Sequence, residues 1–213
     1  ITMPSIYQLK PAFQNLLRPF VQWLYAKHIS ANQVTLLAMF NSVALAIALY
    51  SLHLYQQPLT LFWLFPLWML MRMAFNAIDG MLAREFHQQS KLGAYLNEIC
   101  DVISDTALCL CFFGLAFINS YLLVFVVFLA ILSEYACVMA ATIGQERRYD
   151  GPMGKSDRAF WFSFIAICVI FSATFIQNNH LNSLIYFCNG LLVCIAILLI
   201  LTIYNRIKNS IQL

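Results

Sequence analysis

Long apolar runs separated by short polar stretches set the pattern of this chain. Six runs approach or exceed the roughly 20 residues that an α-helix needs to cross a bilayer. They lie at residues 34–52, 59–78, 99–118, 121–142, 159–176 and 183–204. The pattern predicts an all-α membrane protein with six transmembrane helices, in a single domain of residues 1–213 whose six-helix core covers residues 30–208.

A segment of mixed polarity, residues 4–28, precedes the first run. Its apolar residues follow helical spacing, and they are Phe13, Leu16, Leu17, Phe20, Val21 and Leu24. We expect an amphipathic helix in the membrane interface, kinked at Pro19, rather than a soluble helix on a partner domain, because the chain offers no soluble domain. Ser30 and Gln33 then form a capping box, which predicts that the first spanning helix starts near Asn32 and Thr35.

The basic residues fall on one side of the predicted spans. The composition is 62% hydrophobic and 10% charged, and all 12 lysines and arginines lie at or close to the same ends of the helices. The opposite loops, around His53, Asn119 and Asn178, carry none. The positive-inside bias therefore places both termini in the cytoplasm. The net charge of +3 suits anionic lipid headgroups or phosphate ligands, and no nucleic-acid partner is expected.

Cysteine and histidine give no metal or redox signature. The seven cysteines fall inside predicted helices without a CxxC pair, and the four histidines form no HExxH motif. We interpret the cysteines as small buried hydrophobic residues and expect no zinc site.

Oxygen-bearing side chains gather at the facing ends of the second and third runs. Asn76 and Asp79 share one helix face with Arg72, and four-residue steps link Asn97, Asp101 and Asp105, with Glu98 beside them. We expect the second helix to end at Asp79-Gly80, where glycine allows a positive φ or a close ligand, and Gly93 to open the third helix.

This cluster has the composition of a site for hard divalent cations. Magnesium, manganese and calcium favour carboxylate and carbonyl oxygens, and magnesium commonly binds carboxylates together with substrate phosphates. Basic residues at Arg84, Lys155 and Arg158 suit a pyrophosphate. The implied chemistry is phosphoryl or phosphodiester transfer, in which a carboxylate takes the proton of an attacking hydroxyl.

Glu134 stands in the otherwise apolar fourth run, directly after Ser133. A carboxylate within a membrane span is a functional-site hypothesis, but it also serves as a structural partner for Arg72 or for backbone groups. Both interpretations stay open from the sequence.

The polar residues between Asn76 and Asp101 resemble a known signature. The pattern Asp79-Gly80-x2-Ala83-Arg84-x8-Gly93-x3-Asn97-x3-Asp101 resembles that of the CDP-alcohol phosphatidyltransferase family, DxxDGxxAR followed after eight residues by GxxxDxxxD. The spacing matches throughout. The resemblance extends to the six spans, the interfacial helix, an SANQVT segment similar to the family's TPNxxT, and a GKSDR loop similar to its phosphate-binding loop.

The resemblance implies transfer of a substituted phosphate from a CDP-linked lipid, commonly CDP-diacylglycerol, to an acceptor alcohol with release of CMP. It implies metal ligation by Asn76, Asp79, Asn97 and Asp101, with Mg²⁺ or Mn²⁺ as cofactor and Ca²⁺ also able to bind, and Asp101 as general base. It assigns the nucleotide to Asn32, Thr35, Gly80, Ala83, Arg84 and Gly93, and phosphate of the acceptor or donor to Lys155 and Arg158. It further implies a homodimer in the inner (plasma) membrane, with the active site facing the cytoplasm.

Two positions depart from the family pattern. Asn76 and Asn97 stand where the family has its first and third aspartates, so the site loses two formal negative charges. An amide oxygen still binds a divalent cation, but more weakly than a carboxylate. We hypothesise that Glu98 or Asp105 restores the lost charge.

Two other functions compete with the transferase. A small transporter would use Glu134 and the acidic cluster to carry cations, although such sites usually lie near the bilayer midplane. A catalytically silent relative would bind the CDP-linked lipid without turning it over. The sequence leaves the acceptor alcohol open.

Overall fold

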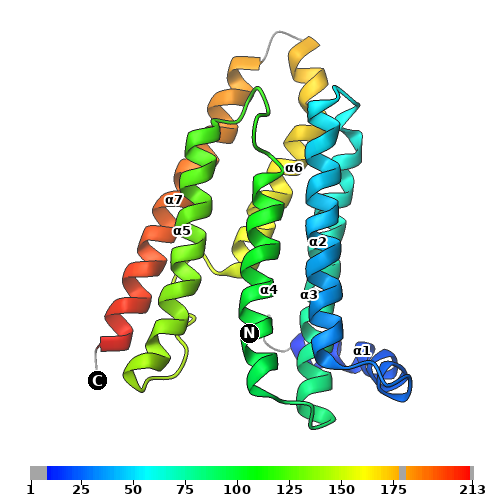
Figure 1. Ribbon diagram of the computed structural model, residues 1–213. Helices are drawn as coiled ribbons and strands as arrows, with labels where there is room; N and C mark the ends of the chain where they lie inside the picture. The colour runs from blue at the N-terminus through cyan, green and yellow to red at the C-terminus, as the bar shows by residue number, and fades with distance from the viewer. Residues whose placement is uncertain (1–8, 178–180, 212–213) are drawn as a thin grey trace, which may run out of the picture. The chain divides into compact units, whose positions relative to one another are not determined.

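The computed structural model describes residues 9–177 and 181–211, and all the regular structure in these ranges is helical (Figure 1). The predicted start of the interfacial helix at residue 4 and the loop around Asn178 lie outside them. The elements are α1 (Leu9–Ala26), α2 (Ala31–Leu54), η2 (Leu59–Trp63), α3 (Leu64–Glu85), α4 (Lys91–Leu110), α5 (Ser120–Met139), η3 (Ala140–Ile143), α6 (Lys155–Gln177) and α7 (Leu181–Ile211).

The chain is a membrane protein. Within the described residues four helical segments are long and apolar enough to cross a bilayer, namely Ala31–Leu54, Leu59–Glu85, Ser120–Ile143 and Leu181–Ile211. Helix α4 is more polar because it carries Glu98, Asp101 and Asp105. Six spans and cytoplasmic termini stay predictions.

Two helix ends differ from those predicted. Helix α3 continues through Gly80 to Glu85, so the prediction that it ends at Asp79-Gly80 is wrong. The residues Met81 to Glu85 are strong helix formers, and Met81 is buried, so packing favours the extra turn. Helix α4 ends at Leu110 rather than near residue 118, and Gly114 follows with a φ of 84°.

The described chain groups into two compact units. Unit 1 contains the described residues up to Ser42 and the segment Trp68–Ser104, whereas unit 2 contains Val43–Leu67 and the described residues from Asp105 onward. Helices α2, α3 and α4 each contribute residues to both units. The units are therefore not successive segments of the chain, and each is considered by itself below.

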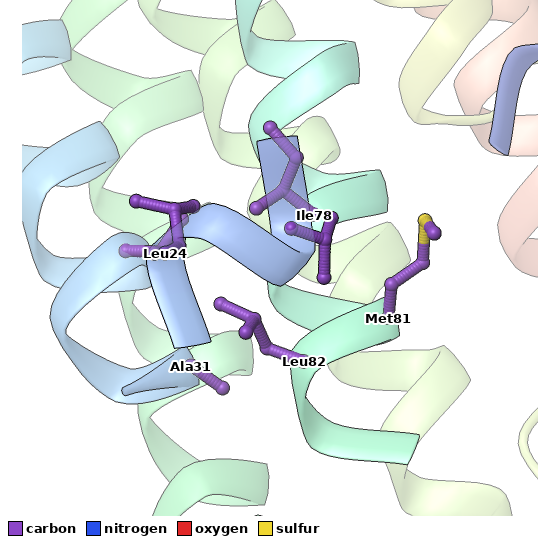
Figure 2. Close-up of a cluster of buried hydrophobic side chains, with 7 residues drawn as sticks. Leu24, Ala31, Ile78, Met81 and Leu82 are labelled. Atoms are coloured by element: carbon purple, nitrogen blue, oxygen red, sulfur yellow. The ribbon is translucent and has the colours of Figure 1, made fainter. Parts of the chain in front are cut away.

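The core of unit 1 forms where α1 meets the start of α2 and the end of α3 (Figure 2). Its buried residues are Val21, Leu24, Ala31, Val34, Ile78, Met81 and Leu82. The predicted capping box is confirmed, because the backbone amide of Ser30 donates to Gln33 Oε1 over 2.9 Å and the amide of Gln33 donates to Ser30 Oγ over 3.3 Å. The cap fixes the start of α2 against this core.

Helix α1 also presents an apolar surface away from this core. Leu16 is 75% exposed, and the rings of Phe20 and Trp23 stack with their centroids 5.6 Å apart on the exposed side. Arg18 of α1 donates a hydrogen bond to Oε1 of Glu85, the last residue of α3, over 3.0 Å. This hydrogen bond and the charge of the carboxylate raise the pKa of Arg18. The helix thus joins unit 1 through one face only, and its place in the membrane interface stays a prediction.

Unit 2 is built on α5 and α7, which pack along each other (Figure 1). They run in the same direction, because Asn189 of α7 contacts Asn119 at the start of α5, and Arg206 contacts Ser133 further along. Helix α6 packs against α7 and η2. Phe112 fills the space between them, with its ring next to those of Phe62 and Phe162.

Removing a side chain from the core in Figure 2 should destabilise the protein. Leu82 is fully buried, so Leu82→Ala should lower the free energy of unfolding by about 2–5 kcal/mol through lost burial and a cavity. Leu92, on α4, is 63% exposed, and Leu92→Ala is the matched control. Thermal unfolding in detergent measures both, and equal melting temperatures for the two variants would contradict the packing described.

Candidate active site

Unit 1 brings together nearly all the residues predicted to bind metal and nucleotide. Asn76, Asp79, Gly80, Ala83 and Arg84 lie on α3, and Gly93, Asn97, Glu98 and Asp101 lie on α4. Asn32 and Thr35 lie in the first turns of α2. Asp105, Lys155 and Arg158 belong to unit 2. Three helices therefore supply one polar cluster in unit 1.

Asp79 is held by the first turns of α2. Thr35 Oγ1 donates a hydrogen bond to Asp79 Oδ2 over 2.8 Å, and the carboxylate is buried, with Asp79 only 7% exposed. A buried carboxylate is costly unless it is paired or hydrogen-bonded. Thr35, predicted to lie near the nucleotide, thus also orients the predicted metal ligand.

Asp101 is paired with an arginine. Arg72 Nη2 lies 3.4 Å from Asp101 Oδ1, and Arg72 is 6% exposed. The sequence placed Arg72 on the same face of α3 as Asn76 and Asp79 and offered Glu134 as a possible partner, whereas the carboxylate beside Arg72 is that of Asp101. A buried arginine requires a carboxylate or other acceptor, but the spacing alone does not say which one.

Gly93 lets α4 approach the start of α2 closely. A Cβ atom at Gly93 would lie 2.8 Å from Asn32 Oδ1, closer than real contacts allow, and 3.0 Å from Ser90 Oγ. A Cβ atom at Gly80 would lie 3.1 Å from Arg84 Nη2. Both glycines therefore leave space beside polar side chains predicted to bind the nucleotide, and Gly80 does so within a regular helix.

The oxygen donors of unit 1 set what the site can bind. They comprise the carboxylates of Asp79 and Asp101 and the amide oxygens of Asn76 and Asn97. In the described part of the chain, no three histidine, cysteine, aspartate or glutamate side chains converge as a metal site. Carboxylate and amide oxygens are ligand types that hard divalent cations accept.

In unit 2, Glu134 and Asp105 surround a buried arginine. Arg158 Nη2 lies 2.8 Å from Glu134 Oε1 and 3.1 Å from Asp105 Oδ2. Arg206 Nη1 lies 3.7 Å from the same glutamate oxygen and donates to the Ser133 carbonyl. The partners of Glu134 are therefore Arg158 and Arg206, which favours its structural interpretation.

The basic loop before α6, residues 144–154, is attached to α7 by hydrogen bonds. The amide of Met153 donates to Thr202 Oγ1 over 2.9 Å, and Arg206 Nε donates to the Asp150 carbonyl over 3.3 Å. Gly151 has a φ of 120°, and a Cβ atom there would lie 2.7 Å from Thr202. Sequence reasoning missed Thr202 and Arg206, which hold the loop that ends at Lys155.

Solved structures of similar fold include those of Mycobacterium tuberculosis phosphatidylinositol phosphate synthase (PgsA1). The form with CDP-DAG bound gives a TM-score of 0.70 at 18% identity, over 91% of this chain and 92% of that one. The form in complex with manganese and citrate gives 0.69 at 18% identity, over 91% and 88%. At this identity the likeness establishes the fold.

Sequence comparisons identify the family of the chain. The chain is 43% identical over 205 residues to the inner membrane protein YnbA of Escherichia coli strain K12, covering 96% of each protein. A family model described as CDP-alcohol phosphatidyltransferase matches residues 28–206. That range contains every residue of the polar cluster in unit 1, and the chain belongs to the CDP-alcohol phosphatidyltransferase family.

Proposed function

We propose that this protein transfers a substituted phosphate group from a CDP-linked lipid, CDP-diacylglycerol or a close analogue, to the hydroxyl of an acceptor alcohol. The observation that carries the proposal is that two motif aspartates of unit 1 are held by neighbouring side chains. Asp79 accepts a hydrogen bond from Thr35, and Asp101 is paired with Arg72. The structure of PgsA1 with CDP-DAG bound supports a CDP-linked donor.

A divalent cation, Mg²⁺ or Mn²⁺, is the proposed cofactor. Asn76, Asp79, Asn97 and Asp101 are the proposed ligands, and their two carboxylates and two amides fit one hard cation together with phosphate oxygens. When bound, it would offset the charge that develops on the transferred phosphate. Glu98, which also lies in unit 1, is the further carboxylate that we propose.

Asp101 is the proposed general base. Its carboxylate takes the proton of the acceptor hydroxyl, the hydroxyl oxygen forms a bond to the phosphorus attached to the lipid, and the bond from that phosphorus to CMP breaks. Arg72 holds Asp101 Oδ1, which restricts the rotation of the carboxylate. Asn32, Gly80, Ala83, Arg84 and Gly93 are the proposed nucleotide contacts.

We place this reaction at the inner membrane, with a multi-pass chain and the site facing the cytoplasm. The name of the relative YnbA supports the inner membrane, and the clustering of basic residues at one end of the predicted spans supports the orientation. The exposed apolar face of α1 suits the headgroup region. A homodimer is also expected from the family resemblance.

Lys155 and Arg158 are the proposed phosphate or acceptor ligands, but they differ in one respect. Arg158 is 3% exposed, and two carboxylates compensate its charge. Lys155 is the first residue of α6, where its charge adds to the positive end of the helix dipole. Because Lys155 is less buried than Arg158, we assign direct phosphate contact to Lys155 and a positioning role to Arg158.

A second candidate function is binding of the CDP-linked lipid without turnover. Asparagine at positions 76 and 97 and the pairing of Asp101 with Arg72 favour it, because both reduce the negative charge that holds a catalytic cation. Mass spectrometry distinguishes the two. Purified protein given CDP-diacylglycerol, Mg²⁺ or Mn²⁺ and a panel of alcohols should release CMP and form a new lipid, whereas binding without CMP release would establish the silent form.

Loss of the proposed base should abolish most turnover. Asp101→Asn removes the proton acceptor and should lower kcat by about 10²–10⁴-fold, the usual contribution of a general base. Glu146→Gln, in the exposed loop before α6, is the control that removes a carboxylate elsewhere. CMP release measures both variants, and full activity of Asp101→Asn would exclude this residue as the base.

Gly93→Ala should weaken nucleotide binding without unfolding the protein. The new methyl group would displace the Asn32 side chain, and we expect an affinity for CDP-diacylglycerol about tenfold lower. Gly190→Ala is the matched control, because nothing lies within 4 Å of a Cβ atom there. Isothermal titration calorimetry in detergent measures the affinities. Equal values for both variants would contradict a role of the close approach between Gly93 and Asn32 in nucleotide binding.

Lys155→Met and Arg158→Met should have different effects. Lys155→Met should raise KM with little change in melting temperature, whereas Arg158→Met should lower the melting temperature because it leaves Glu134 and Asp105 without that partner. Thermal unfolding and steady-state kinetics measure the two quantities. An Arg158→Met variant with an unchanged melting temperature but a raised KM would contradict the positioning role and indicate that Arg158 contacts phosphate directly.

A further inference from the structure

The loop between α3 and α4 begins with a tight turn that ends α3. His87 adopts a left-handed backbone conformation with a φ of 55°, and the amide of Gln88 donates to the Ala83 carbonyl over 3.1 Å. A hydrogen bond of this span across a left-handed residue is the Schellman arrangement of helix ends. The turn therefore holds the backbone of Gln88 against the last turn of α3.

The side chain of Gln88 binds a different helix. Its Oε1 atom accepts a hydrogen bond from the amide of Ala31, the first residue of α2, over 2.8 Å. Amides in the first turn of a helix have no acceptor within the helix, so they need one from elsewhere. Ala31 is buried in the core drawn in Figure 2, and the loop between α3 and α4 supplies its acceptor.

Asn32, the next residue of α2, lies against the start of α4. A Cβ atom at Gly93 would be only 2.8 Å from Asn32 Oδ1, so the two helix starts approach closely. The amide of Gly93 donates to Ser90 Oγ over 2.9 Å, which caps α4. Gln88 thus fixes the residue before Asn32 and lies two residues before the cap of α4.

Gln88 links the three helices that carry the proposed nucleotide contacts. Its backbone is bound to α3, its side chain is bound to the first residue of α2, and its loop leads into α4. The proposed contacts, all in unit 1, are Asn32, Thr35, Gly80, Ala83, Arg84 and Gly93. A site that is already ordered binds its ligand more tightly, because less ordering is required on binding.

We propose that Gln88 is a positioning residue of the nucleotide site, and that it orients Asn32 for the CDP group by holding the start of α2 against the loop before α4. The inference rests on the proposed transferase function and adds a residue that the motif leaves unspecified, between Arg84 and Gly93. Gln88 acts through Ala31 and Asn32, by its hydrogen bond to the start of α2.

Replacing the acceptor should weaken donor binding. Gln88→Met removes the side-chain oxygen at similar length and should lower the affinity for CDP-diacylglycerol about five- to tenfold, the effect of one lost hydrogen bond. KM for the donor should rise by the same factor, with kcat within about twofold of the wild type. Gln88→Glu keeps an oxygen at the same reach and should restore the affinity. Gln89→Met, at the exposed neighbouring position, is the matched control.

A double-mutant cycle with Asn32→Ala distinguishes positioning from a general loss of stability. If Gln88 acts through Asn32, Gln88→Met should have little further effect on affinity once Asn32 is alanine. Isothermal titration calorimetry in detergent with Mg²⁺ measures the affinities, and CMP release measures kcat and KM. Gln88→Asn, whose oxygen is one carbon too short, replaces Gln88→Met if that variant does not fold.

Three results would overturn the inference: equal affinities of Gln88→Met and Gln89→Met, no recovery in Gln88→Glu, or additive losses in the cycle with Asn32→Ala. The same samples also separate this inference from the proposed function. The expected affinities without CMP release would support the role of Gln88 and contradict the transferase. CMP release with equal KM values for Gln88→Met and Gln89→Met would do the opposite, and a wild type that does not bind CDP-diacylglycerol would contradict both.

Discussion

Burial of arginine is the constraint on which the polar part of this protein depends. Arg72, Arg158 and Arg206 are 6%, 3% and 2% exposed. A guanidinium keeps its charge, so each must find acceptors inside the fold. Arg72 is paired with Asp101, and Arg158 and Arg206 are both paired with Glu134. These ion pairs connect α3 with α4 in unit 1, and α5 with α6 and α7 in unit 2.

The same constraint gives a physical reason for the asparagines. A carboxylate at position 76 or 97 would lie one turn from a member of the Arg72–Asp101 pair and compete for the same guanidinium. An amide offers oxygen without a second charge, so the pair keeps one geometry.

Local patterns in the sequence predicted the helices, and non-local packing decided where they end. The capping box of Ser30 and Gln33 needs only residues three apart, so it could be predicted. The continuation of α3 past Gly80 depends on Met81 and Leu82 packing in the core with α1 and α2. The partners of Glu134 could not be predicted either, because Arg206 lies 72 residues further along the chain. The motif residues of unit 1 could be named from spacing, but the pairing of Asp101 with Arg72 could not.

Charge compensation also changes what the basic loop before α6 can do. A loop rich in lysine and arginine suggests a flexible strap that closes on an anion, yet Thr202 and Arg206 of α7 bind its backbone at Met153 and Asp150. Gly151 fits against Thr202 only because it has no side chain. The protein itself therefore holds the loop, without need of a ligand. Because the backbone is fixed, Lys155 is held at the first turn of α6, where the amide of Gly154 donates to Asp157 Oδ2 over 2.9 Å.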